Sequence, residues 1–527
     1  MDSPIVTRIF RELFRHPACR SRQNFSRLRQ AAFASRHVPR IQHHQRRHYA
    51  VKTRLTVGEK TNESAWKPRS ELFPADRAAE FDTYETVTAE QLKGRTTRPQ
   101  KVKMLMRDFV DDSLYNPNYG YFSKNVVIFS PGDAFDFPAY ANEPAFHTEL
   151  SNRYTEFEDA LDAAAGEGLR DDRPLWHTPT ELFRPYYGEA IARYLVSNYR
   201  LTTYPYHDLI IYEMGAGRGT LMLNILDYIR EMDPQVYART QYRVIEISSS
   251  LAALQSRHLR ESDALDAGAA AAAAVQSAAA SAVAASPHAD HVEIINRSIF
   301  DWSEPVPSPC FFLGLEVFDN FAHDCLRYDL STGEPLQSRV LIDDRGDFHE
   351  FYDPVLDPVA ARFLRVRHAA TAGRYPVPYT SNRTLRGLRS SLGGDRLSAP
   401  EYIPTKLMLF FDVLEKYFPA HRLLTSDFHS LPDAVEGLNG PVVQTRYERR
   451  TVPTSTPLVH QGYFDIMFPT DFNTIECMYQ AITGKLTRVS THGDFMRRWA
   501  YLEDTQTRSG ENPLLSYYHN ASVMVTV

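Results

Sequence analysis

The middle of the chain alternates short apolar runs with segments of helical periodicity. Four apolar runs predict buried strands, at residues 208–214, 242–247, 292–296 and 309–317. Apolar positions at helical spacing predict helices between the first three strands, at 220–232 and 248–259. Strands separated by helices are typical of a parallel sheet whose two faces are both covered. We therefore expect an α/β fold with a mostly parallel sheet and helices on both faces.

The flanking regions carry weaker patterns. Helical spacing predicts further helices, at 101–114, 188–199, 401–418, 473–482 and 493–501. Apolar runs predict a strand at 422–428 and short strands between 440 and 470. Four stretches lack such periodicity, namely a polar lead-in at 51–100, a charged insertion at 139–175, an alanine-rich tract at 264–288 and a loop at 379–400. We expect the lead-in to be flexible and both insertions to lie on the surface.

Composition is that of a globular protein and excludes several classes. The 527 residues are 43% hydrophobic and 24% charged, which is close to the globular average. No run of about 18 apolar residues occurs, so we expect no membrane-spanning helix. The four cysteines, Cys19, Cys310, Cys325 and Cys477, are widely spaced and form no CxxC pair. We therefore expect reduced thiols and no metal site.

The net charge of −6 hides a basic N-terminus. Residues 1–50 contain 11 arginines, no lysine and two acids, so their net charge is +9 and that of the remainder is −15. The arginines alternate with apolar residues, as in a mitochondrial transit peptide, and the string RHYA at 47–50 resembles a matrix processing site. A nucleic-acid-binding arm is the alternative, but the acidic body would repel phosphates. We expect a mitochondrial matrix protein with cationic partners and no nucleic-acid partner.

The most informative string is YEMGAGRGT at 212–220, directly after a predicted strand and directly before a predicted helix. Gly215, Gly217 and Gly219 would permit backbone conformations closed to other residues and let a ligand approach the main chain. A dinucleotide fingerprint would place the third glycine one residue later. The GxGxG spacing preceded by Glu213 resembles motif I of class I S-adenosylmethionine-dependent methyltransferases, whose cofactor is a cation without phosphate. A tight turn that binds nothing is the alternative.

Three further residues complete the predicted cofactor site. Glu246 ends the second strand, where a carboxylate can accept both ribose hydroxyls, and a surface glutamate is the alternative. Asp301 follows the third strand, where such enzymes contact adenine, and a helix N-cap is the alternative. Thr220 begins the helix after the glycine turn. The predicted cofactor is S-adenosyl-L-methionine.

A pair of acids follows the fourth strand. Glu316 and Asp319 stand three residues apart, so a turn would point both carboxylates into the crevice at the strand ends. Paired carboxylates suit a guanidinium because they match its fork of N–H donors and make the attacking nitrogen more electron-rich. We predict that both residues are catalytic. A helix-capping acid beside a surface acid is the alternative.

With these residues in view, the chain resembles the MidA family, the mitochondrial complex I assembly methyltransferases that modify a protein arginine. The resemblance covers about 104–505 and rests on segments at 106–121, 188–189, 213–224, 244–248, 316–319, 424–428, 465–472 and 493–495. Ala216 stands where the family usually has proline. The resemblance implies a Rossmann-like class I methyltransferase fold, S-adenosyl-L-methionine as cofactor, and a protein substrate that is a subunit of respiratory complex I.

The resulting expectation divides the chain into five parts. They are a transit peptide at 1–50, a lead-in at 51–100, an N-terminal substrate-side region at 101–200, a cofactor-binding core at 201–330, and a C-terminal part at 331–527 that completes the sheet and the substrate side. Two other functions stay open. One is that of an assembly chaperone that retains the cofactor pocket. The other is that of a nucleotide-dependent oxidoreductase, although the GxGxG spacing counts against it.

Overall fold

The computed structural model describes residues 78–123, 127–165, 174–260, 286–379 and 396–527, and the backbone of 51–52 and 69–70. The predicted transit peptide, most of the lead-in before residue 78, and the alanine-rich tract from 264 to 285 lie outside these residues. The strands β1 (Val51–Lys52) and β2 (Arg69–Ser70) pair antiparallel. Among the residues that are described, no helix is both long and apolar enough to cross a membrane.

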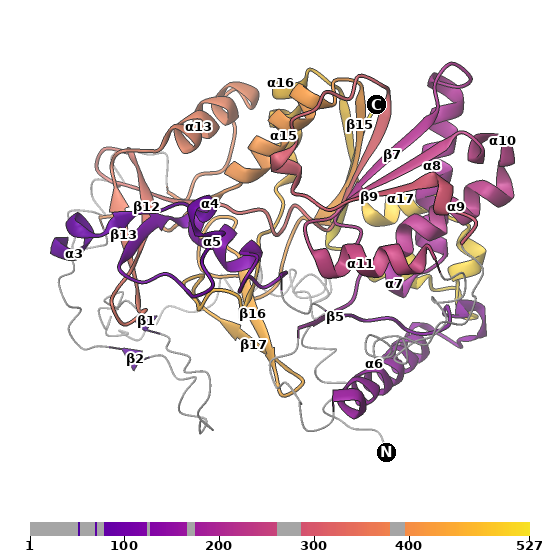
Figure 1. The fold of residues 1–527 in the computed structure, drawn as a ribbon, viewed down its shortest axis with the longest axis horizontal. Coiled ribbons are helices and arrows are strands. Elements are labelled where there is room, and N and C mark those ends of the chain that lie inside the picture. Colours follow the sequence, from indigo (N-terminus) through magenta and orange to yellow (C-terminus); the bar gives the residue numbers. More distant parts are fainter. Residues whose placement is uncertain are drawn as a thin grey trace, which may run out of the picture.

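A seven-stranded sheet forms the centre of the molecule, in the order β19-β20-β15-β10-β7-β8-β9 (Figure 1). Its strands are β7 (Leu209–Met214), β8 (Thr240–Ile245), β9 (Val292–Ile295), β10 (Cys310–Leu315), β15 (His421–Phe428), β19 (Thr487–Thr491) and β20 (Ala521–Thr526). Neighbours from β9 to β15 are parallel, whereas β20 is antiparallel to both β15 and β19. The structure therefore confirms the mostly parallel, Rossmann-like sheet.

Helices cover both faces of this sheet because alternate strand residues point to opposite sides. Leu209 and Ile211 of β7 pack into a core that also contains residues of α8 (Tyr186–Thr202) and α9 (Thr220–Met232). Tyr212 and Met214 pack on the other side. The helices of that second face are α15 (Thr405–Tyr417) and α16 (Phe472–Thr483). Figure 1 shows these two pairs of helices on either side of the strands.

Shorter helices complete this part of the fold. They are α7 (Pro179–Leu182), α10 (Pro234–Tyr237), α11 (Ser249–His258), α17 (His492–Trp499), α18 (Pro513–Ser516), and the 3-10 turns η3 (Phe137–Ala139), η6 (Ala289–His291), η7 (Ile299–Asp301) and η8 (Leu502–Thr505). α11 supplies Gln255 to the cavity region, and η7 supplies Asp301.

A second sheet contains strands that precede β7 and strands that follow β10 in the sequence. Its order is β14-β11-β12-β4-β3, and β13 also pairs with β12. Its strands are β3 (Glu85–Thr86), β4 (Val102–Leu105), β11 (Asp324–Tyr328), β12 (Pro335–Ile342), β13 (Phe348–Asp353) and β14 (Glu401–Ile403). The helices beside it are α3 (Ala78–Thr83), α4 (Ala89–Leu92), α5 (Met106–Tyr115) and α13 (Pro358–Ala370). Figure 1 shows β12 and β13 next to α4 and α5, although more than 200 residues separate them.

Three expectations are corrected here. Residues 78–100, predicted as a flexible lead-in, carry α3, β3 and α4, and Leu92 is fully buried. The predicted helix at 101–114 begins as a strand, because residues 102–105 form β4 and pair with β12 before α5 begins. The insertion at 139–175 contains the long helix α6 (Glu143–Ala165), whose Phe146 and Leu150 are buried in the main core.

Two small sheets lie near the cavity. One holds β16 (Val442–Tyr447), β17 (Arg450–Thr454) and β18 (Asp465–Met467), and the other pairs β5 (Val127–Ile128) with β6 (Leu175–Trp176). Both contribute residues to the wall of the cavity. They place side chains from remote parts of the chain opposite the strand ends of the central sheet.

Candidate active site

A cavity of about 1180 Å³ opens at the carboxyl ends of β7, β8 and β10. The chain passes from β7 to β8 on one side, and β10 lies on the other side of β7, so the strand order reverses there. Ligands of open α/β sheets bind at such a reversal. Eight of the nine predicted site residues line the cavity. The ninth, Gly219, is the N-cap of α9.

The glycine turn has the conformation that its sequence predicts. Gly215, Gly217 and Gly219 have φ values of +72°, +54° and +83°, in the left-handed region that favours glycine. A Cβ on Gly217 would lie 2.9 Å from Cδ1 of Ile128, and one on Gly215 would lie 2.8 Å from Cγ1 of Val317. The turn therefore has neither the backbone angles nor the space for a side chain, and its main chain faces the cavity.

Glu246 is buried at the end of β8 and lines the cavity. Its Oε1 accepts a hydrogen bond from the Ser248 backbone N–H at 2.9 Å, and its Oε2 accepts one from Gln255 Nε2 at 3.2 Å. Gln255 Nε2 also donates to the carbonyl oxygen of Gly217 at 2.8 Å. Burial raises the pKa of Glu246 to about 7. The surface alternative is wrong, and Gln255 ties the carboxylate to the glycine turn.

Glu213 lies deeper, at the end of β7. Its Oε2 accepts a hydrogen bond from the Tyr242 hydroxyl at 2.7 Å, and burial raises its pKa to about 7. Asp301 is exposed at the end of η7 and lines the cavity. The N-cap of η7 is Ser298, whose hydroxyl accepts from the Phe300 N–H, so the capping alternative for Asp301 is wrong.

An acid that we did not assign to the site contacts the glycine turn. Glu181 of α7 is 2% exposed, and its Oε1 accepts a hydrogen bond from the Thr220 hydroxyl at 2.5 Å. Arg218 Nε lies 3.8 Å from the same oxygen. Glu181 Oε2 and Arg218 Nε are buried without a hydrogen-bond partner. This carboxylate and guanidinium are complementary to a ligand that carries both an ammonium and a carboxylate group.

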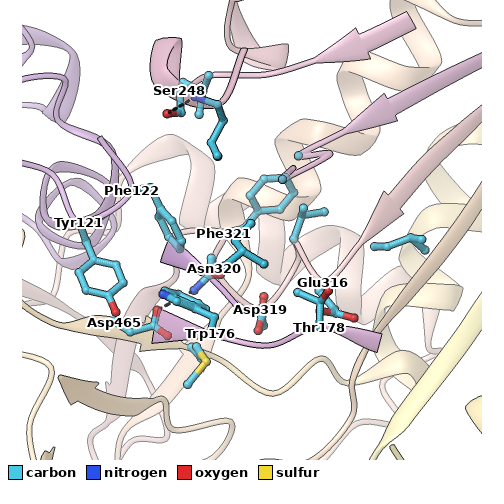
Figure 2. A pocket seen from close by; sticks show the side chains of 18 of the residues that line it. Tyr121, Phe122, Trp176, Thr178, Ser248, Glu316, Asp319, Asn320, Phe321 and Asp465 are labelled. Atoms are coloured by element: carbon cyan, nitrogen blue, oxygen red, sulfur yellow. Dashed lines mark hydrogen bonds between the residues drawn. The ribbon is translucent and has the colours of Figure 1, made fainter. Parts of the chain in front are cut away.

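Glu316 and Asp319 occupy a sharp turn after β10. Glu316 has a φ of +54°, which costs energy for a residue with a side chain, and its N–H donates to the Ser426 carbonyl at 2.8 Å. Asp427 Oδ2 accepts from the backbone N–H groups of Phe318 and Asp319, at 2.8 and 3.3 Å. The turn is thereby fixed with both carboxylates facing one space (Figure 2).

The surface alternative for this pair is wrong. Asp319 is 3% exposed, and its Oδ1 has no hydrogen-bond partner. Burial and the neighbouring Asp427 raise the pKa of Glu316 well above its usual range, and burial with Asp427, Asp465 and Glu316 does the same for Asp319. Burial also raises the pKa of Asp465 to about 8.

Lys406 and Arg446 line the same cavity, but they pair with Asp111 and Glu158 and not with these four carboxylates. No ion pair in the described part of the chain joins Glu316, Asp319, Asp427 or Asp465 to an arginine or lysine. Nor do three or more histidine, cysteine, aspartate or glutamate side chains of that part come together as a metal site. Without a cation such carboxyl groups hold their protons, as their raised pKa values indicate, and a cationic ligand would favour their ionised forms.

Comparison with known proteins shows to which family the chain belongs. A family model described as "Putative S-adenosyl-L-methionine-dependent methyltransferase" matches residues 190–491. The chain belongs to this methyltransferase family. The match extends from α8 to β19 and includes the glycine turn, Glu246, and the acids after β10.

The methyltransferase is similar to two curated fungal proteins, each named "Protein arginine methyltransferase NDUFAF7 homolog, mitochondrial". The protein of Schizosaccharomyces pombe is 23% identical over 426 residues, 76% of this chain and 80% of the relative. The protein of Saccharomyces cerevisiae is 22% identical over 362 residues, 65% of this chain and 78% of the relative. A solved structure of a COG1565 superfamily member from Burkholderia thailandensis, bound to S-adenosyl-homocysteine, aligns with a TM-score of 0.47 and 15% identity, covering 81% of this chain and 88% of that one.

The cofactor of the methyltransferase is S-adenosyl-L-methionine, and the cavity fits it. The cofactor supplies a methyl group attached to a positively charged sulfur. Glu246 retains acceptor capacity for ribose hydroxyls, because a carboxylate has about four acceptor sites and the bonds from Ile247, Ser248 and Gln255 do not use all of them. The unpartnered atoms of Glu181 and Arg218 match the ammonium and carboxylate of the methionine portion. Gly215 and Gly217 line the cavity with main chain that carries no side chain.

Sequence reasoning missed Glu181, Asp465 and Tyr518. Tyr518 precedes β20, is 4% exposed, lines the cavity, and has a hydroxyl with no hydrogen-bond partner. Glu316 contributes to its raised pKa, so the two side chains are neighbours. None of the three residues sits in a local motif that predicts a ligand. The resemblance of 465–472 to an element of the MidA family is the available signal for Asp465, and a looser resemblance at 178–181 is the signal for Glu181.

Proposed function

We propose that this methyltransferase methylates the guanidinium group of arginine in a protein substrate. The observation that carries the proposal is the pair of carboxylates after β10, Glu316 half-buried and Asp319 buried, with which no arginine or lysine of the described chain forms an ion pair. A guanidinium supplies the missing positive charge, and its planar fork of N–H donors matches two carboxylates side by side. The names of the two fungal relatives agree with this substrate class.

Glu316 and Asp319 have defined tasks in this proposal. Their oxygens accept hydrogen bonds from the N–H groups of the guanidinium and fix its plane. They also stabilise the positive charge of the group while one of its nitrogens accepts the methyl group. One carboxylate accepts the proton that this nitrogen loses as it takes the methyl group, and the electron pair of the broken carbon–sulfur bond stays on the sulfur. A raised pKa suits that step because it makes the carboxylate a stronger base than an exposed one. Asp427 positions both residues through the backbone of the turn.

We further propose that the protein acts in mitochondria, on a subunit of respiratory complex I during assembly. The basic segment at 1–50 supports import, and both fungal relatives are named as mitochondrial. The complex I substrate rests on the resemblance to the MidA family. The net charge of −15 outside residues 1–50 favours a cationic substrate surface.

Identification of the methylated product tests the proposal. The protein is incubated with labelled S-adenosyl-L-methionine and mitochondrial extract, and labelled proteins are hydrolysed to amino acids. We expect the label in methylarginine. Label in methyllysine or in small molecules would contradict the arginine substrate, and absence of any protein label would favour an assembly chaperone that retains the cofactor pocket.

A further inference from the structure

The cavity continues beyond the cofactor region into a part whose walls come from other elements. Tyr121 and Phe122 follow α5, Trp176 ends β6, and Asp465 begins β18. All four line the cavity. Figure 2 shows them on the side away from Glu316, with Asp319 in between. This end of the cavity has no assigned role in cofactor binding.

Aromatic rings form a continuous wall there. The centroid of Trp176 lies 5.5 Å from that of Tyr121 and 5.4 Å from that of Phe122. Phe122 in turn stacks on Tyr115 at 5.4 Å, with 21° between the ring planes. Trp176 Nε1 is buried and has no hydrogen-bond partner. The wall therefore presents the faces of aromatic rings, and the Trp176 N–H is a donor available to a ligand.

Asp465 is the acid of this end. It is 3% exposed, and its Oδ1 accepts a hydrogen bond from Asn320 Nδ2 at 3.1 Å. It contributes to the raised pKa of Tyr121, so the acid and the aromatic wall are neighbours. The amide of Asn320 also donates to the Ile466 carbonyl at 3.2 Å, which ties β18 to the turn after β10. Asp465 retains acceptor capacity that these contacts do not use.

The acids form a row in which Asp319 is central. Both Glu316 and Asp465 contribute to the raised pKa of Asp319, whereas Asp465 is not among the causes for Glu316. Figure 2 shows the same order, with Glu316 at one end and Asp465 beside Tyr121 at the other. The unpartnered Oδ1 of Asp319 belongs to this row. A ligand along the row would meet carboxylates on one side and aromatic rings on the other.

We infer that Asp465 and the wall of Tyr121, Phe122 and Trp176 form the specificity site for a planar cation, the guanidinium of a peptide-borne arginine. A guanidinium stacks on aromatic faces while its N–H groups reach carboxylates in the same plane, which a rounded ammonium does not do. The Trp176 N–H is left to donate to a carbonyl oxygen of the substrate chain. This inference rests on the proposed function and adds residues that select arginine over lysine.

Calorimetry on the full-length protein loaded with S-adenosyl-homocysteine tests the inference. The probes are Nα-acetylarginine methylamide and Nα-acetyllysine methylamide. We expect saturable binding of the arginine probe, at least about tenfold weaker binding of the lysine probe, and a loss of about tenfold or more in Asp465→Asn. Trp176→Leu, which removes the stacking face, weakens the arginine probe as well, while Trp176→Phe retains part of the affinity.

Asp344→Asn is the matched control, because Asp344 is exposed in the turn between β12 and β13. It leaves both affinities unchanged. Equal binding of the two probes, no saturable binding by the parent protein, or an unchanged affinity in folded Asp465→Asn would overturn the inference. Melting temperatures establish that each variant is folded.

Parallel methyl-transfer assays separate this outcome from that of the proposed function. Arginine methylation that is indifferent to Asp465→Asn leaves the function and removes the specificity site. Binding of the arginine probe that depends on Asp465, without arginine methylation, leaves the site and removes the function.

Discussion

Cofactor binding depends on the protonation state of the Glu246 carboxyl. Burial raises its pKa to about 7, so the carboxyl is largely protonated at pH 6 and largely ionised at pH 8. Only the ionised form has its full capacity to accept two ribose hydroxyls. Affinity for the cofactor therefore increases as the pH rises through 7.

We expect the Kd for S-adenosyl-L-methionine to fall by up to about tenfold between pH 6 and pH 8. In Glu246→Gln the side chain keeps its size but does not titrate, so the affinity is about tenfold to a hundredfold lower at pH 8 and its pH dependence is reduced. Calorimetry at several pH values measures both. Glu213, whose pKa is also about 7, is the other titrating group nearby. An undiminished slope in Glu246→Gln would assign the effect to Glu213.

Elements of the central sheet were predictable because their patterns are local. The runs at 208–214 and 309–317 are buried on both faces, and the helices between strands have strong apolar periodicity, so β7, β10, α9 and α11 lie within a few residues of their predicted bounds. The second sheet was not predicted. The apolar residues of 102–105 fit helical spacing, and they form a strand through pairing with β3 and with β12, which is more than 200 residues away.

The site also combines residues that a local pattern predicts with a residue that only the fold brings close. The glycine turn and Glu246 carry a recognisable motif, and Glu316 and Asp319 are a short local pair. Asp465 reaches this pair only because β18 pairs with β16 and Asn320 donates to its carboxylate. Such a contact spans 145 positions of the chain, so spacing within one segment does not indicate it.

The contact between α8 and α9 depends on Gly188. A Cβ at this position would lie 2.6 Å from Cβ of Asn224, so Gly188→Ala forces the two helices apart. We expect a loss of about 1–3 kcal/mol in the free energy of unfolding, with methyl transfer per folded molecule retained. Chemical denaturation measures this loss. Gly94→Ala is the control, because nothing lies within 4 Å of its added Cβ, and an equal effect of both substitutions would contradict the packing argument.

The whole molecule holds two sets of buried titratable groups with opposite effects. Burial raises the pKa of Glu213 and Glu246 to about 7 and that of Asp465 to about 8, so the folded state binds more protons than the unfolded state above pH 4. Their stabilising contribution is fully present below about pH 4 and is lost as the pH rises from there to the folded-state pKa values of 7 to 8. Four buried histidines have pKa values lowered to about 3 or 4, namely His177, His323, His421 and His492. Their contribution is lost as the pH falls below about 6.5.

We therefore expect the stability of the ligand-free protein to fall between pH 6.5 and pH 8, because the carboxyls still titrate in this range and the histidines titrate mostly below it. Each carboxyl with a pKa near 7 contributes a loss of about 1 kcal/mol over this range. Differential scanning calorimetry measures the trend, and Asp465→Asn reduces it. A melting temperature that stays constant or rises from pH 6.5 to pH 8 would contradict the assignment of these carboxyls as buried and unpaired.

In the proposed function, Glu316 and Asp319 hold the guanidinium during methyl transfer. The most direct test of this role is the rate of methyl transfer to arginine by Glu316→Gln, measured with folded protein and saturating S-adenosyl-L-methionine. The substitution keeps the size of the side chain and removes its charge, so we expect turnover to fall by at least about two orders of magnitude while cofactor affinity stays nearly constant. Asp319→Asn loses less. Activity within a few-fold of the parent in both variants would contradict this role.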